Sequence, residues 1–513
     1  YWLTGDERYA QEFVNEVRGW ISANPYAWSV NWACAMDVAL RAVSWIWGFY
    51  FFADAAACRS DEFRSQFLRS LYLHGKFVAT NLEQSDVNGN HYLCDGVGLV
   101  FLGCFFGATS RGRKWRSTGR ELVISEIFNQ VSVDGVDFEQ STAYHRLVLE
   151  AFMTSYLLLQ KHGDVVAADA WTRLQGMCEY VEAYTKPNGL APLVGDADDG
   201  RIQSLGTQPI GDHRYLLSNA AAIFGRPSFK AKASCFTDES FWTFGPDGLA
   251  RFRAIDASQA DAPTPSSAAF SDGGVYILRS ADAHVVIDCA EVGMRGRGGH
   301  GHNDILSFEL FLNGMNVVSD CGAYLYTASR EWRNAFRSTA YHNGLQVDGE
   351  EVNRFISPDA LWQLQYDAHP IGATLERGPK VDRFCGSHDG YARLTAPVVH
   401  TRECVLDRDH PRVLVRDSLS GSGSHALTWR FHLDPAITPE GDGKNVRLTN
   451  GATEVWLIPV EQATGMTLDV ADGWISPSYG VRVPTKVLVW HVRASVPLTV
   501  SFLFAESPLA PSL

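Results

Sequence analysis

The chain has 513 residues, of which 46% are hydrophobic, and its formal net charge is -14 at pH 7. This length exceeds what one hydrophobic core usually supports, so we expect two domains. The acidic balance argues against a nucleic-acid-binding protein, which needs a basic face. The most apolar stretch, AVSWIWGFYFFADAAA (42–57), follows an amphipathic pattern with Asp37 and Arg41 and is interpreted as a buried helix, not a membrane span.

Cysteine usage and the first residue bear on the cellular location. The ten cysteines have no CxxC spacing and several have apolar neighbours, so we expect mostly reduced core residues. The chain begins at Tyr1, in what resembles the end of one helix entering another. We therefore expect that an upstream portion has been removed, and a missing signal peptide then says nothing about location.

The first part of the chain has helical periodicity. Apolar residues recur at three- and four-residue spacing, and Asn-Pro, Asn-Gly and Asp-Gly turns separate the repeats. The pattern predicts helices at 9–23, 32–57, 62–81, 91–107, 115–131, 139–162, 165–185 and 213–224. Short connections favour antiparallel neighbours. Residues 1–235 are thus predicted to form an all-α domain, a toroid of helical hairpins with N-terminal helices missing.

The periodicity changes after this region. Ser, Asp, Ala and Pro accumulate within 236–270, which is interpreted as a linker or crossover. From 271 to 513 the apolar residues alternate in many short segments, with Asn-Gly and Asp-Gly turns between them. This pattern is typical of an antiparallel β-sandwich. The expected fold class is therefore α+β and multidomain, with the helical toroid followed by the sandwich.

The stretch GRGGHGHNDILSFELFLNGMNVVSD (296–320) combines chemistry with a hairpin signal. His300 and His302 flank one glycine at the expected mouth of a strand, so their side chains should point the same way. Asn313-Gly314 should turn the chain back and bring Asp320 towards both imidazoles. His342 follows downstream. Two imidazoles and one carboxylate, with room for water, suit a zinc site.

Two further polar clusters lie in the helical part, NGNHY (88–92) and EQSTAYHR (139–146). Together with GHGHND, the downstream SD and YHN, this order of motifs resembles the heparinase II/III-like polysaccharide lyases, a superfamily that includes oligoalginate lyases. The resemblance also covers PLVGDADDGR (192–201) and the C-terminal strands. It implies an (α/α) toroid, a β-sandwich and an active site in the cleft between them.

The resemblance implies β-elimination at a uronic acid and assigns the roles. Asn90 and His91 would face the substrate carboxylate or the proton on C5, and neutralising that carboxylate makes the proton removable. Tyr144 would be the acid and, on syn geometry, also the base, with a pKa lowered by a cationic neighbour. His300 would be the other histidine in the cleft.

The remaining expectations concern ligands. The resemblance makes His302, Asp320 and His342 ligands of a structural Zn²⁺ that holds the loop of His300. Five side chains are expected at or beside the acidic polysaccharide: Arg201, Arg295, Arg297, Arg337 and His145. The expected substrate is a uronic-acid-containing polysaccharide, a glycosaminoglycan such as heparan sulfate or a similar acidic glycan, with alginate as the alternative. The location is expected to be periplasmic or secreted. A zinc-dependent hydrolase and a non-catalytic carbohydrate-binding scaffold stay open as alternatives; neither nucleic acid nor membrane is expected as a partner.

Overall fold

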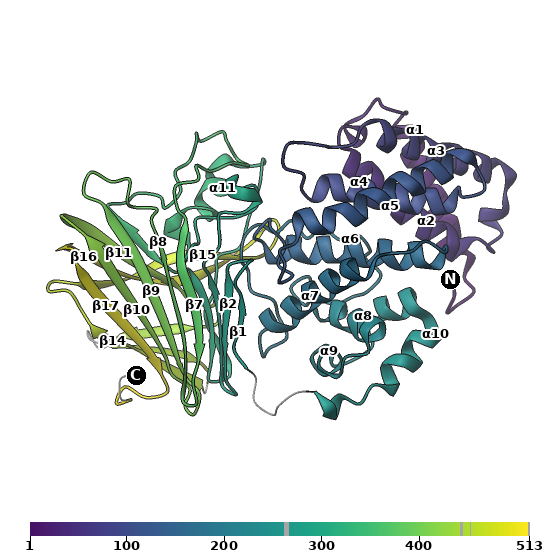
Figure 1. The fold of residues 1–513 in the computed structure, drawn as a ribbon. Coiled ribbons are helices and arrows are strands. Elements are labelled where there is room, and N and C mark those ends of the chain that lie inside the picture. Colours follow the sequence, from purple (N-terminus) through teal and green to yellow (C-terminus); the bar gives the residue numbers. More distant parts are fainter. Residues whose placement is uncertain (261–265, 442–444, 452, 511–513) are drawn as a thin grey trace. The chain divides into compact units, whose positions relative to one another are not determined.

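The structure is a computed structural model and describes residues 1–260, 266–441, 445–451 and 453–510 (Figure 1). It divides into two compact units. The helical unit comprises Tyr1–Val131, Leu147–Leu174 and Arg201–Ser204. The sheet unit comprises Ser132–Arg146, Gln175–Gly200 and Leu205–Leu513. Residues 132–146, 175–200 and 205–235 of the predicted helical domain therefore belong to the unit that holds the sheets.

The helical unit confirms the helices that periodicity predicts. They are α1 (Glu7–Ala23), α2 (Ala35–Phe52), α3 (Asp61–Thr80), α4 (Asn90–Phe105), α5 (Ser110–Gln130), most of α6 (Thr142–Lys161) and the start of α7 (Ala168–Tyr184). Side chains of Asp6, Ser60 and Thr109 accept a backbone N–H in the first turn of α1, α3 and α5, which fixes where these helices begin. No helix within the described residues is both long enough and apolar enough to cross a membrane.

The sheet unit contains a helix where a linker is predicted. After α8 (Arg214–Phe224) and α9 (Pro227–Ala233), helix α10 covers Asp238–Ala254. The predicted linker or crossover over 236–270 thus contains a helix, and its residues 261–265 lie outside the described part. Thr237 caps α10, but Gly245 and Pro246 kink it, and a Gly-Pro pair in a short segment conceals the helical period.

The strands pair antiparallel throughout, as predicted. One sheet has the order β1-β2-β3-β4-β5, a second β12-β13-β14-β17-β10-β9-β8-β7 and a third β15-β16-β11-β6. The first sheet consists of β1 (Ala268–Phe270), β2 (Val275–Arg279), β3 (Ala283–Asp288), β4 (Phe308–Leu312) and β5 (Met315–Val318). The third consists of β6 (Leu345–Val347), β11 (Ser424–His432), β15 (Thr467–Ser478) and β16 (Val481–Ser495).

The second sheet is the largest. Its strands are β7 (Pro370–Arg377), β8 (Val381–His388), β9 (Val398–Asp407), β10 (Val413–Gly421), β12 (Thr438–Gly441), β13 (Val446–Asn450), β14 (Thr453–Glu461) and β17 (Leu498–Ala505). Figure 1 shows β8, β9, β10 and β17 side by side. One buried apolar cluster takes residues from all three sheets, among them Leu310, Phe504 and Trp429. This shared core is what the alternating pattern predicts for a sandwich.

The β4–β5 hairpin confirms the Asn313-Gly314 signal. Both turn residues have positive φ, 51° and 82°, as a two-residue turn of this kind requires. His300 and His302, however, do not stand at the mouth of β4, because the chain between them and Phe308 is irregular. Their common direction comes from a shared hydrogen-bond partner in another loop.

Candidate active site

His300 and His302 share one hydrogen-bond partner, Asp196, which is fully buried in the sheet unit. His300 donates from Nδ1 to Oδ2 of Asp196 over 3.0 Å, and His302 donates from Nε2 to Oδ1 over 2.9 Å. Arg333, on helix α11 (Arg330–Phe336), binds both carboxylate oxygens, with 2.8 Å from Nη2 to Oδ2. The Asp196 carboxylate thus links the 186–200 loop by hydrogen bonds to the loop of His300 and His302 and to helix α11.

The charges around Asp196 decide its ionisation. Burial raises the pKa of Asp196, but the Arg333 guanidinium and the hydrogen bonds from His300 and His302 outweigh it and hold the pKa well below its ordinary value. Arg333 is itself buried, and its guanidinium lies 5.2 Å from the ring centre of Tyr326 and 5.0 Å from that of Trp362. Asp196 and Arg333 therefore form an ion pair between two fully desolvated groups. We call this pair, with His300 and His302 bound to it, the hub of the site.

Tyr144 lies directly against this hub. Its ring stacks on His300 with 3.7 Å between ring centres and 20° between ring planes. Its hydroxyl donates to Oδ2 of Asp198 over 3.0 Å and lies 3.4 Å from the hydroxyl of Tyr326. The predicted pair of Tyr144 and His300 is thus brought together, with the tyrosine hydroxyl held at one position.

The ionisation of Tyr144 differs from the prediction. Burial and the negative charges of Asp198 and Asp196 raise the pKa of Tyr144 well above its ordinary value. The nearby Arg333 is paired with Asp196, which offsets its effect on the pKa of Tyr144. The expected lowering of the pKa by an adjacent imidazolium or guanidinium is therefore wrong: the pKa of Tyr144 is raised, so its phenol is protonated at neutral pH.

Close backbone packing places the two loops. Gly195 has φ +72°, and a Cβ there would lie 2.5 Å from the carbonyl oxygen of Gln140, next to the start of α6. Gly301, between the two histidines, lies so close to the Val292 carbonyl that a Cβ would be 2.1 Å from its oxygen. Glycine is required at both positions. This explains the glycines in the GDADDG and HGH motifs.

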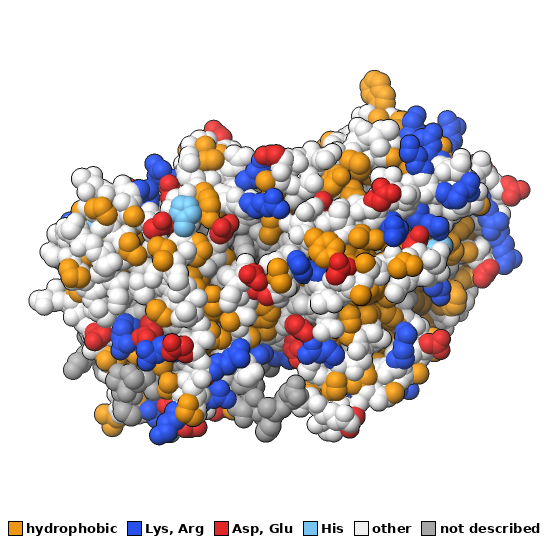
Figure 2. All heavy atoms as spheres, viewed as in Figure 1, with side chains coloured by type: hydrophobic (Ala, Val, Ile, Leu, Met, Phe, Trp, Pro, Cys, Tyr) orange, Lys and Arg blue, Asp and Glu red, His pale blue; other side chains and the backbone are white. Residues whose placement is uncertain are grey.

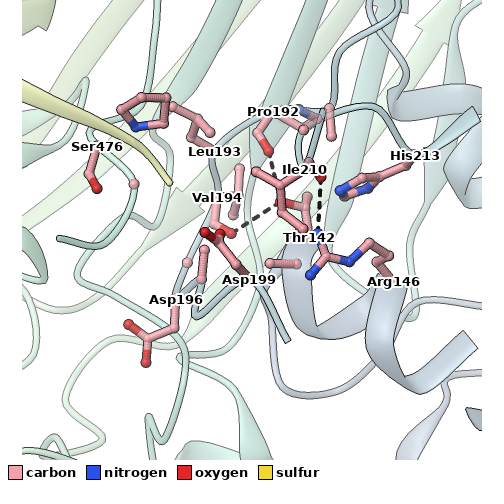
Figure 3. A pocket seen from close by; sticks show the side chains of 17 residues that line it. Thr142, Arg146, Pro192, Leu193, Val194, Asp196, Asp199, Ile210, His213 and Ser476 are labelled. Carbon is pink, nitrogen blue, oxygen red and sulfur yellow. Dashed lines mark hydrogen bonds between the residues drawn. The ribbon is translucent and has the colours of Figure 1, made fainter. Parts of the chain in front are cut away.

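A small pocket lies between the first turn of α6 and the 186–200 loop (Figure 3). Thr142 donates to the carbonyl oxygen of Pro192 over 2.7 Å, and Arg146 donates to that of Gly200 over 2.7 Å. The Asp196 carboxylate is directed away from these two side chains. The first turn of α6 therefore holds the loop on one side, and Asp196 reaches the histidines on the other.

His302, Asp320 and His342 lie together, each offering one donor atom within 4.8 Å of the others. All three side chains are buried, and His342 Nδ1 donates to Oδ2 of Asp320 over 2.9 Å. Nδ1 of His302 and Nε2 of His342 are buried without any hydrogen-bond partner among the described residues. Buried ring nitrogens without a partner are costly unless a ligand satisfies them. This donor set fits the predicted Zn²⁺.

Asn90 and His91 belong to the helical unit, at the start of α4. Asn90 is buried, whereas His91 is exposed and donates from Nδ1 to Glu83 over 2.7 Å. Gly89 is the N-cap residue of α4, and Asn90 is the first residue of the helix. The catalytic roles of both residues stay predictions.

Three side chains that were expected at or beside the substrate are instead buried and bonded within the protein. His145 is 1% exposed, with Nε2 bonded to the Met177 carbonyl and Nδ1 to the Asp137 amide, and burial lowers its pKa to about 4. Arg337 is fully buried and binds Asn334 and two backbone carbonyls. Arg201 forms a buried ion pair with Glu150 at 2.6 Å. These side chains stabilise the folded chain through internal hydrogen bonds and an ion pair. The amino-acid composition does not indicate that they are buried.

Arg295 and Arg297 remain as the predicted anion-binding pair. They lie in the loop that leads into His300, Arg295 exposed and Arg297 half-buried. On the face drawn in Figure 2, Lys and Arg are interspersed with Asp and Glu. A mixed surface agrees with the acidic net charge, so anion binding would depend on local groups such as these two.

Several members of the site are absent from the sequence-based set: Asp196, Asp198, Tyr326, Arg333 and Glu309. Glu309 on β4 accepts from Lys186 Nζ over 2.7 Å and from the amides of Leu193 and Asp320. It ties the 186–200 loop to the hairpin that carries Asp320. An acidic residue in the middle of the apolar run SFELFL is the signal that could have revealed it.

The comparisons with known proteins fit this architecture. A helical region followed by antiparallel sheets, with buried His, Asp and Tyr in the loops, defines the class of α-toroid plus β-sandwich proteins. Residues 1–210 match the family model "Heparinase II/III N-terminus", and residues 262–503 match "Heparinase II/III-like, C-terminal". The chain belongs to the heparinase II/III-like family.

Relatives and solved structures are consistent with this membership. The chain is 26% identical to a heparin-sulfate lyase of Pedobacter heparinus over 74% of the chain, and this alignment spans only 54% of that relative. The chain is also 21% identical to a heparin-sulfate lyase of Bacteroides stercoris, and this alignment covers 100% of the chain and 73% of that relative. Its fold is similar to the crystal structure of a heparan sulfate lyase mutant from P. heparinus, with TM-score 0.71, 22% identity and coverage of 99% and 75% of the two chains.

Proposed function

We propose that the chain is a polysaccharide lyase that cleaves a uronic-acid-containing glycosaminoglycan of the heparan sulfate type by β-elimination. Relatives named heparin-sulfate lyase support the substrate class, although the chain spans about half the length of the first of them. The observation that carries the proposal is the stack of Tyr144 on His300, with Asp198 fixing the phenol and Asp196 fixing the imidazole.

The geometry supports separate acid and base. Tyr144 is protonated, so it is suited to donate to the departing O4 but not to accept the C5 proton. Its stacking partner His300 takes the C5 proton in our proposal. The C5–H electrons form the C4=C5 double bond, the C4–O4 bond breaks, and O4 receives the phenolic proton. The proton on His300 then returns to Tyr144, which restores both groups.

Neutralisation of the substrate carboxylate is the second requirement. The C5 proton is acidic enough for removal only when the adjacent carboxylate charge is neutralised. We assign this task to Asn90 and His91, the first two residues of α4. Arg295 and Arg297 would bind further anionic groups of the polymer outside the reacting sugar.

We also propose a structural Zn²⁺ held by His302, Asp320 and His342. When bound, the ion would satisfy the partnerless ring nitrogens of His302 and His342. The other ring nitrogen of His302 holds Asp196, which in turn holds His300. Through this chain of bonds the metal ligands would orient the base, as residues around metal sites commonly do.

The metal proposal predicts a stability effect. The chain should contain one zinc per molecule by elemental analysis, and a chelator should lower its melting temperature because binding to the folded state alone stabilises it. His342→Gln should lose the metal, and the chelator should no longer change its melting temperature. His369→Gln, an exposed histidine paired with Asp389, is the matched control and should keep the zinc. A wild-type protein without zinc and insensitive to chelator would contradict the proposal.

The function itself is tested by the ultraviolet absorbance of the unsaturated uronate. We would follow it on heparan sulfate, hyaluronan, chondroitin, alginate and polyglucuronate. The proposal predicts the fastest rise on heparan sulfate, whereas a rise confined to alginate would move the chain to the oligoalginate lyases. If the absorbance rises on none of these polymers but the chain binds one of them, a carbohydrate-binding scaffold would be favoured. A periplasmic or secreted location stays a prediction.

A further inference from the structure

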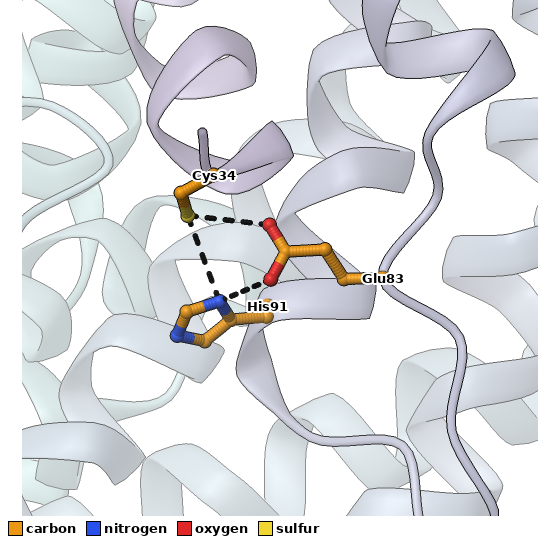
Figure 4. Close-up of side chains that lie close together, drawn as sticks. All are labelled: Cys34, Glu83 and His91. Atoms are coloured by element: carbon orange, nitrogen blue, oxygen red, sulfur yellow. Dashed lines mark hydrogen bonds and ion pairs between the residues drawn. The ribbon is translucent and has the colours of Figure 1, made fainter. Parts of the chain in front are cut away.

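His91 is held by a group of polar side chains in the helical unit (Figure 4). Its Nδ1 donates to Oε2 of Glu83 over 2.7 Å and lies 3.8 Å from Sγ of Cys34. Cys34 immediately precedes α2, and Glu83 lies in the loop between α3 and α4. Residues from three separate segments therefore meet at one nitrogen of one ring.

Glu83 is itself fixed in place. Its Oε1 accepts the backbone N–H of Met36 over 2.9 Å and the thiol of Cys34 over 3.2 Å. Its own backbone N–H donates to Oδ2 of Asp95, one turn into α4, over 2.7 Å. Both carboxylate oxygens thus have defined partners, and the direction of the Glu83–His91 bond is set by the starts of α2 and α4.

We propose that Glu83, supported by Cys34, is a positioning residue that holds His91 by Nδ1 and presents its Nε2–H to the substrate carboxylate. This inference rests on the proposed lyase function and deepens it. Within the described residues no hydrogen bond involves Nε2 of His91, and the side chain is half exposed. Nε2 is therefore the ring nitrogen that a ligand could reach.

The environment also keeps the ring charged. The hydrogen bonds to Cys34 and Glu83 raise the pKa of His91 to about 10, against the lowering effect of burial. Burial raises the pKa of Glu83, but the bonds from His91 and Met36 outweigh it and lower the pKa to about 2. The charged or titratable groups facing His91 are Cys34, Glu83 and the more distant Asp95. An imidazole that is protonated at neutral pH can neutralise a carboxylate but cannot abstract the C5 proton.

Cys34, Glu83 and His91 also resemble a metal-ligand set, since their donor atoms lie within 4.8 Å of one another. The partners distinguish the two sites. His302 and His342 have buried ring nitrogens without partners, whereas here the thiol, the carboxylate and Nδ1 bond each other. The hydrogen-bonded ion pair already satisfies these donors, so we assign positioning, with metal uptake as an outcome that the test would reveal.

The test is a titration of His91 by NMR on the full chain labelled with ¹³C-histidine, the His91 signal being assigned by its loss in His91→Gln. We expect the wild-type ring to stay protonated up to a pH of about 10, whereas in Glu83→Gln its pKa should fall towards the ordinary value of about 6.5, because the variant loses the carboxylate charge beside Nδ1. Cys34→Ser, which keeps a hydrogen-bonding group, should preserve the high value. Glu62→Gln, an exposed glutamate of the same unit, is the control and should change nothing. A wild-type His91 that titrates near 6.5, or is unaffected by Glu83→Gln, would overturn the proposal, as would stoichiometric Zn²⁺ binding that Cys34→Ala abolishes.

Activity provides the second measurement. Glu83→Gln should reduce kcat/KM about 30-fold at pH 8, the loss of protonated ring expected for a pKa of about 6.5, and much less at pH 6. A merely structural role of Glu83 would lower kcat/KM equally at both pH values and would contradict the inference. If the chain shows no lyase activity at all, the proposed function fails, but the NMR titration still decides whether Glu83 sets the state of His91.

Discussion

Replacement of Tyr144 by Phe is expected to lower lyase turnover by about 10³-fold, within the range that a general acid contributes. The variant keeps the ring that stacks on His300 and loses only the hydroxyl that would protonate O4. That hydroxyl bonds Asp198 and neighbours Tyr326, so its removal should cost only about 1 kcal/mol of the free energy of unfolding. Steady-state kinetics and urea unfolding measure the two effects.

Tyr156→Phe is the matched control for this variant. Tyr156 lies on the same helix, is also buried, and donates its hydroxyl to the Val123 carbonyl over 3.2 Å. It should lose a similar free energy of unfolding and keep full turnover. Equal turnover in Tyr144→Phe and Tyr156→Phe would show that Tyr144 supplies no proton.

Asp196→Asn should have the largest effect on stability. The substitution leaves the Arg333 guanidinium buried without a counter-charge, and breaking a buried ion pair in this way costs about 3–5 kcal/mol. It also removes the acceptor that orients His300 and His302, so turnover should fall together with stability. Thermal and urea unfolding, with kinetics on the folded fraction, measure both.

Asp359→Asn tests whether the cost comes from burial. Asp359 also pairs with an arginine of α11, Arg330, but both side chains are mostly exposed, so its loss should cost less than about 1 kcal/mol. The pH dependence gives a further check. Because the pKa of folded Asp196 is depressed, its stabilisation is present above the unfolded value of about 3.9 and is lost as pH falls below it. A stability difference between wild type and Asp196→Asn that stays constant down to pH 2 would contradict the ion-pair explanation.

The periodicity of the sequence was sufficient to predict most elements of both parts. Helices such as α3 and α4 begin within one residue of the predicted positions, because apolar spacing and turn residues are local signals. The β4–β5 turn follows from Asn313-Gly314, since few other pairs tolerate positive φ at both positions. Tyr144 and His300 could be paired in advance only through the resemblance, as more than 150 residues separate them.

The hub of the site could not be predicted in the same way. Asp196 lies in GDADDG, which has the composition of an ordinary surface turn, and its partners come from two distant segments. Arg337 and Arg201 were expected to contact the substrate, but partners inside the protein occupy both side chains. Whether an arginine faces solvent or a buried carboxylate depends on tertiary packing, which no local pattern encodes.

One time course on heparan sulfate tests whether the chain cleaves by elimination with Tyr144 as proton donor. Absorbance of the unsaturated uronate and new reducing ends would be counted in the same reaction. Elimination should give one unsaturated uronate for each new reducing end in the wild type, and both should form about 10³-fold more slowly in Tyr144→Phe. Reducing ends without the absorbance, or undiminished absorbance in Tyr144→Phe, would contradict it.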